Sequence, residues 1–214
     1  MVSQADTWPG QSPGLRARPP LVLLHGLWDT PRLFQRLERE LLGRCPQLEI
    51  YAPHLPHGLG GTPIRVLAQQ LAGLIEARFG SHTRLDLLGF SMGGVIGRTW
   101  LQELGGHRRC RRFVCLGSPQ RGTLSAQFVP HALLAGIADM KIGSPLLRDL
   151  ERGSGSLVGL DCHSLYCPTD ITVFPGWWAV LPVGRRRALP VLTHRQLIAH
   201  PWAVRRLADL LLAG

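Results

Sequence analysis

The stretch LDLLGFSMGG, residues 85–94, decides how the rest of this sequence is interpreted. Residues 85–88 form a short, mainly apolar run typical of a buried strand, and the segment that begins at Gly93 has helical spacing. Between them, Ser91 stands at the centre of a G-x-S-x-G pattern, which is typical of a sharp strand-to-helix turn. We therefore expect the Ser91 hydroxyl to project from the end of a sheet.

Outward from this turn, strand-like apolar runs alternate with segments of helical periodicity. Strands are expected at 21–24, 48–53, 85–88, 113–116, 164–166 and 188–192. Helices are expected at 30–42, 63–78, 93–104 and 201–212. This alternation predicts an α/β fold, with a mostly parallel sheet covered by helices on both faces.

Two segments depart from the alternation. Residues 1–20 carry four prolines together with glycine and serine, so we expect a flexible leader there and one domain at 21–214. Between about 119 and 161 we expect an insertion with an apolar helix at 124–138. A second, short helix follows, with Ser144 as its cap, Pro145 at its first position and Gly153 after its end. The insertion is a candidate lid, and whether it moves is left open.

The charge of the chain comes almost entirely from arginine. The formal net charge is +10, and Lys141 is the only lysine. Basic clusters lie at 108–112 and 185–187, each directly before an expected strand. No aromatic residues alternate with these arginines and no groove-reading motif accompanies them, so we expect no nucleic-acid partner. A transient contact with a membrane surface stays open, because positive potential attracts any anion.

Cysteine usage and hydropathy indicate a cytoplasmic protein. Five cysteines leave one unpaired in any disulfide scheme, which favours reduced thiols over a secreted disulfide framework. The N-terminal residues have no apolar core of signal-peptide length, and no later run reaches the length of a membrane span. The sequence carries no Rossmann glycine pattern, P-loop or metal-ligand spacing, so we expect no cofactor and no metal.

A serine hydroxyl is a weak nucleophile, so Ser91 needs a general base and an acid that orients this base. His194 follows the last expected strand, where a base can reach back over the strand ends; His200 is the rival at the start of the closing helix. Asp170 follows the penultimate strand, and Asp161, before that strand, is the alternative acid. We therefore expect Ser91, Asp170 and His194 to form a catalytic triad.

Charge that develops on a substrate carbonyl oxygen needs hydrogen-bond donors. We expect these to be the backbone N–H groups of Met92, directly after the serine, and of Leu27, in the loop after the first strand. His25 is expected to hold this loop by hydrogen bonds. Several apolar residues are candidates for the wall of an acyl groove and fit ordinary core positions equally well: Trp28, Trp177, Trp178, and in the insertion Phe128, Val129, Leu133 and Leu134.

Together these residues resemble the α/β-hydrolase superfamily, and within it the bacterial triacylglycerol-lipase-like and esterase group. The matching segments are 23–27, 89–94, 116–123 and 143–150, and Asp170 followed by His194. The resemblance implies the same triad and oxyanion hole, formed by Leu27 and Met92. Similar lipases often carry histidine where this sequence has Gln120, which we expect to be a hydrogen-bonding residue of its loop.

The residues and the resemblance predict a lipase-like carboxylesterase. Such an enzyme hydrolyses a carboxylic ester or acyl lipid through an acyl-enzyme on Ser91. An acyltransferase or thioesterase with the same triad is the first alternative, and a non-catalytic binding protein of the same fold is the second. Acyl-chain length, physiological substrate and oligomeric state are left open by the sequence.

Overall fold

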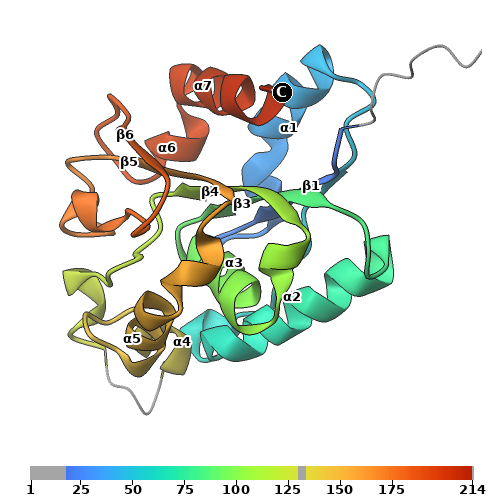
Figure 1. Ribbon diagram of the computed structural model, residues 1–214. Helices are drawn as coiled ribbons and strands as arrows, with labels where there is room; N and C mark the ends of the chain where they lie inside the picture. The colour runs from blue at the N-terminus through green and yellow to red at the C-terminus, as the bar shows by residue number, and fades with distance from the viewer. Residues whose placement is uncertain (1–17, 130–133, 214) are drawn as a thin grey trace, which may run out of the picture.

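The computed structural model describes residues 18–129 and 134–213, so most of the expected leader lies outside the described residues. Within this part of the chain, six strands form one sheet in the order β2-β1-β3-β4-β5-β6, and every neighbouring pair is parallel (Figure 1). The strands are β1 (Leu21–Leu24), β2 (Ile50–Tyr51), β3 (Leu85–Phe90), β4 (Cys110–Leu116), β5 (Asp161–Tyr166) and β6 (Arg185–Ala188). The predicted α/β fold is confirmed.

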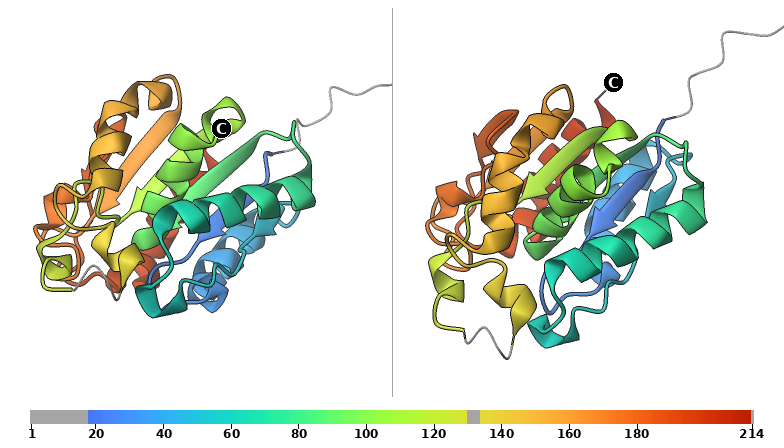
Figure 2. Two further views of the ribbon diagram at one scale, coloured as in Figure 1. Left: turned by 90° about the horizontal axis from the view of Figure 1, so that it is seen from below. Right: turned by 60° about the horizontal axis from the view of Figure 1, so that its bottom comes forward.

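Helices cover both faces of the sheet (Figure 2). They are α1 (Gln35–Arg44), α2 (Ile64–Phe79), α3 (Met92–Glu103), α4 (Ala135–Ala138), α5 (Pro145–Arg152), α6 (Gln196–Ala199) and α7 (Pro201–Leu212). The core has two parts, one under α2 and α3 and the other under α1 and α7. Successive residues of β1 alternate between these two parts, because side chains of a strand point to opposite faces.

The position of the last strand was predicted wrongly. β6 consists of Arg185–Ala188, all four of them exposed, whereas the strand was expected at 188–192. The apolar residues of the expected strand, Leu189 and Val191, are buried in the segment that follows β6. An edge strand has a free side and tolerates charged residues, so the arginine run forms the strand and the apolar run packs beyond it.

The insertion also differs in part from its prediction. A short 3-10 turn at Leu124–Ala126 and the helix α4 replace the single helix expected at 124–138, and residues 130–133 lie outside the described part. Pro130 stands between these two elements, and proline in a helix interior removes a hydrogen bond and clashes with the preceding turn. The following helix is confirmed: Pro145 begins α5, and the Ser144 hydroxyl accepts the Leu147 N–H at 3.2 Å.

No described helix is both long and apolar enough to cross a membrane. All five cysteines fall within the described residues, and each is buried and free.

Candidate active site

Ser91 occupies the turn between β3 and α3 in a backbone conformation that few side chains adopt. Its φ is 53° and its ψ is −127°, and positive φ is costly for any residue other than glycine. The turn is held by the Ser91 N–H, which donates to the Leu116 carbonyl at 2.9 Å. A Cβ at Gly93 would lie 2.3 Å from the Leu24 carbonyl oxygen, and one at Gly89 would lie 2.4 Å from the start of α3. The two glycines therefore allow a turn that a larger residue would block.

Asp170 and His194 meet beyond the ends of β5 and β6. The His194 Nδ1–H donates to Asp170 Oδ2 at 2.6 Å. The other oxygen, Oδ1, accepts the backbone N–H groups of Thr172 at 2.8 Å and Val173 at 3.0 Å. The carboxylate is 1% exposed, so these three donors replace the water that would otherwise solvate its charge. This bonding leaves the lone pair of a neutral His194 ring on Nε2.

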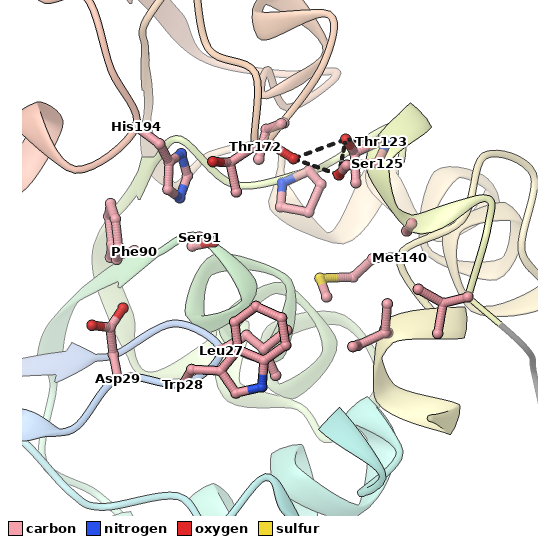
Figure 3. Close-up of a pocket in the computed structure, with 15 residues that line it drawn as sticks. Leu27, Trp28, Asp29, Phe90, Ser91, Thr123, Ser125, Met140, Thr172 and His194 are labelled. Carbon is pink, nitrogen blue, oxygen red and sulfur yellow. Dashed lines mark hydrogen bonds between the residues drawn. The ribbon is translucent and has the colours of Figure 1, made fainter. Parts of the chain in front are cut away.

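Ser91 and His194 lie at the same end of one cavity, beside Phe90 (Figure 3). The cavity has a volume of about 250 Å³. The ring centroids of Phe90 and His194 are 4.8 Å apart, and Nε2 is buried with no hydrogen-bond partner among the described residues. Gly117 directly follows β4 and has a φ of 56°, and a Cβ at this position would lie 3.1 Å from the His194 ring. The structure thus places Ser91 and His194 at one cavity, with Asp170 hydrogen-bonded to the far nitrogen of the His194 ring.

The two alternatives to this base and acid have other partners. His200 caps α7, where its Nδ1 accepts the Trp202 N–H at 3.3 Å. Asp161 lies at the start of β5 and accepts hydrogen bonds from Arg112 at 2.7 Å and from His163 at 2.8 Å. Within the described part of the chain, His200 does not line the cavity, and it is Asp170, not Asp161, whose carboxylate is hydrogen-bonded to the His194 ring.

The loop after β1 passes close to the serine. A Cβ at Gly26 would lie 2.9 Å from the Ser91 Cβ, so the absence of a side chain allows this approach. Leu27 lines the cavity, and its N–H has no hydrogen-bond acceptor within the described ranges. Met92 is the first residue of α3, where the N–H groups of the first turn have no helical acceptor. Both positions suit the expected oxyanion donors.

Two histidines hold this loop against the segment that follows β2. His25 Nδ1–H donates to the Gly26 carbonyl at 3.0 Å, and its Nε2 accepts the Leu55 N–H at 3.1 Å. Burial lowers the pKa of His25, which keeps the ring neutral and able to accept this bond. His57 Nε2 accepts the Trp28 N–H at 3.1 Å. Sequence reasoning identified His25 but missed His57, which lies in a glycine- and proline-rich stretch without a motif of its own.

The cavity wall differs from the expected set. Trp28 lines the cavity, whereas Phe128 and Trp177 are 91% and 57% exposed and are not among its described lining residues. Leu133 lies outside the described part of the chain. The apolar wall contributed by the insertion consists of Ala126, Val129, Ile137 and Met140. Of the insertion residues expected in this wall, Val129 lines the cavity, whereas Phe128 and Leu134 are not among its described lining residues.

Gln120 is a buried hydrogen-bonding residue. Its Oε1 accepts from Arg98 at 3.3 Å, and its Nε2–H donates to Cys115 Sγ at 3.2 Å. Arg98, on α3, is fully buried and also donates to the Leu150 carbonyl at 2.9 Å. These bonds tie the helix after Ser91 to α5, so this end of the insertion is fixed to the site.

Known proteins share this fold. A family model described as palmitoyl protein thioesterase matches residues 20–152. No curated protein matches the sequence. Among solved structures, the mature lipase BlEst2 of Bacillus licheniformis has a TM-score of 0.71 at 16% identity, with 95% of each chain covered. Aspergillus fumigatus lipase B has a TM-score of 0.74 at 17% identity, covering 94% of this chain and 54% of that one. An extracellular alpha/beta-hydrolase from a Paenibacillus species has a TM-score of 0.63 at 16% identity, covering 91% and 98%. These similarities show an α/β-hydrolase fold.

Proposed function

The chain belongs to the palmitoyl protein thioesterase family, and on that premise we propose that it is a serine hydrolase cleaving acyl esters through Ser91. One observation carries the proposal: the buried Asp170 carboxylate binds His194 Nδ1 at 2.6 Å, and the same ring lines the cavity that Ser91 lines. The family match includes Ser91 and ends before Asp170 and His194, so the roles of these two residues rest on geometry.

The first half of the proposed reaction transfers the acyl group to the enzyme. His194 Nε2 takes the proton of the Ser91 hydroxyl as Oγ bonds to the carbonyl carbon. The N–H groups of Leu27 and Met92 donate to the oxyanion, each stabilising the transition state by about 3 kcal/mol. Asp170 stabilises the charged ring. When the bond to the leaving oxygen breaks, His194 returns the proton to that oxygen, and an alcohol departs.

The second half releases the acid. A water molecule takes the place of the alcohol, and His194 Nε2 accepts one of its protons as the water oxygen bonds to the acyl carbon. The same two N–H groups hold the second oxyanion. The bond to Ser91 Oγ then breaks, Oγ takes the proton back from His194, and a carboxylic acid leaves.

The cavity suits the acyl part of a short or medium-length ester. Its wall is largely apolar, and its volume of about 250 Å³ lies just below the range of roughly 300–1,000 Å³ common for small-molecule pockets. An apolar wall binds an acyl chain by removing it from water. An ester or acyl lipid whose bound chain fills this cavity is therefore the proposed substrate.

A phosphonylating probe tests the nucleophile. A fluorophosphonate should label the wild-type protein and Ser81→Ala, whose serine is exposed and remote from the cavity, but not Ser91→Ala. Hydrolysis of p-nitrophenyl esters should be lost in the same variant and should peak at short or medium acyl length. Equal labelling of Ser91→Ala and the wild type would refute the proposal.

A thioester is the second candidate substrate, favoured by the family to which the chain belongs. The same three residues serve a sulfur leaving group, because a thiolate departs with less need of a proton than an alkoxide. Paired substrates with one acyl chain and either an oxygen or a sulfur leaving group keep the cavity contacts constant. A kcat/KM that is higher for the thioester identifies a thioesterase, and the reverse order identifies an esterase.

A further inference from the structure

His57 holds the loop that carries one of the two oxyanion donors, although it is not among the described residues that line the cavity. Its Nε2 accepts the Trp28 N–H at 3.1 Å, and only 9% of the residue is exposed. Burying an imidazole to this degree costs free energy unless its nitrogen atoms make hydrogen bonds. Among the described residues Nδ1 has no hydrogen-bond partner, so the bond from the Trp28 N–H to Nε2 is the one use of this ring that the structure shows.

Trp28 needs such support because of its backbone. Its φ is 58°, a conformation that is unusual for a bulky residue and persists only where the surroundings enforce it. The segment after β2 supplies two acceptors: His57 Nε2 for the backbone N–H, and the Leu59 carbonyl for the indole Nε1–H at 3.2 Å. In the opposite direction, the Leu55 N–H donates to His25 Nε2 at 3.1 Å. Each segment therefore holds the other through a histidine.

The bond to His57 also determines which N–H remains available. It occupies the N–H of Trp28, while the preceding N–H, that of Leu27, has no acceptor within the described ranges. Gly26 brings the same loop to within contact of Ser91. A change in the Trp28 conformation would therefore shift the loop that carries the Leu27 N–H relative to the serine.

From this arrangement we propose that His57 is a positioning residue for the hydrolysis proposed above. By accepting the Trp28 N–H, it fixes the loop so that the Leu27 N–H points to the position of the oxyanion. This role rests on the proposed function of Ser91. It predicts that loss of the His57 acceptor slows the chemical step and leaves binding of the acyl group unchanged, because His57 does not contact the bound chain.

Three variants separate this role from a general effect on folding. His57→Phe keeps a planar ring but removes the acceptor, and His57→Gln supplies another acceptor at a similar reach. His54→Phe is the matched control, because exposed His54 stacks on His25 at 5.4 Å without a hydrogen bond to the loop. We expect kcat to fall by up to about 100-fold in His57→Phe with KM unchanged, and to recover in part in His57→Gln. His54→Phe should match the wild type.

A second readout does not depend on substrate. Hydrogen exchange of the Trp28 amide, followed by NMR in the free protein, should accelerate in His57→Phe and stay slow in His54→Phe. Wild-type kcat in His57→Phe, a loss confined to KM, or unchanged exchange of this amide would overturn the proposal. If His57→Phe does not fold, His57→Leu makes the same comparison. A wild-type protein that is inactive on every ester and thioester would refute the proposed function itself, while the exchange rates would still report the hydrogen bond.

Discussion

Asparagine at position 170 would change one atom of the site and reverse the direction of one hydrogen bond. Asp170 Oδ1 accepts two backbone N–H groups, those of Thr172 and Val173, so the carbonyl oxygen of an asparagine should take this place. Its NH₂ group then replaces Oδ2, which lies 2.6 Å from His194 Nδ1. Because NH₂ can only donate, Nδ1 must accept, and the ring proton moves to Nε2.

With the proton on Nε2, His194 cannot take the proton of Ser91. The same exchange in the serine-protease triad lowers kcat by about 10⁴, and an equal fall here corresponds to about 5 kcal/mol of activation free energy. Two of the three hydrogen bonds to the side chain keep their direction, and the third is reversed. We therefore expect the free energy of unfolding to fall by only about 2 kcal/mol, which lowers Tm by about 4–8 °C.

The assay is kcat for a p-nitrophenyl ester, with Tm measured on the same samples. Asp161→Asn is the matched control, because Asp161 is the acid that the sequence left as the alternative and binds Arg112 and His163 away from the cavity. It should retain the wild-type kcat. A folded Asp170→Asn that keeps more than about a tenth of the wild-type kcat would refute the reasoning, since a tenfold loss is only about 1.4 kcal/mol. An equal loss in Asp161→Asn would refute it as well.

Three further predictions concern stability and thiol chemistry. Gly93→Ala should lower the free energy of unfolding by about 3 kcal/mol, because its Cβ meets the backbone of β1 at 2.3 Å. Gly73→Ala, on the exposed side of α2 with nothing within 4 Å, should raise this free energy by up to about 1 kcal/mol. Urea unfolding measures both changes. Burial lowers the pKa of His25 below its ordinary 6.5, so the unfolded chain binds this proton more tightly than the folded protein. The contribution of His25 to stability is therefore complete above pH 6.5 and is lost on acidification. The decrease in urea midpoint between pH 7 and pH 5 should be smaller in His25→Asn than in the wild type. Iodoacetamide should modify no cysteine of the folded protein and all five after unfolding, because all five are buried and burial raises the pKa of the Cys110, Cys115 and Cys162 thiols, to about 12 in Cys162; any native-state labelling would contradict this.

Elements with strong local signals could be predicted from the sequence closely. The helix at 201–212 begins at Pro201 after a capping residue and ends where predicted, and α5 has the predicted cap and first residue. The last strand could not be placed in this way. The identity of β6 depends on its pairing with β5, where Arg185 lies opposite His163, and this register is not encoded in local hydropathy.

The residues of the candidate site likewise include some that the sequence predicts and others that it does not. Ser91, Asp170 and His194 were chosen by their order along the chain relative to strand ends; the structure places Ser91 and His194 at one cavity and hydrogen-bonds Asp170 to His194. His57 was missed because its contact with Trp28 joins positions 29 residues apart, and no local pattern marks such a pair. Which apolar side chains of the insertion face the cavity likewise depends on packing that periodicity does not determine.

The arginine run of β6 has a consequence for the protein in concentrated solution. The outer edge of a sheet carries unpaired backbone groups that can bind the edge of a second molecule and start aggregation. On β6 such a meeting would bring the three arginines of one molecule against the three of another. Their repulsion acts over about 10 Å at 0.1 M salt and over about 3 Å at 1 M. High salt should therefore remove this protection and reduce solubility, even though the fold itself is unchanged.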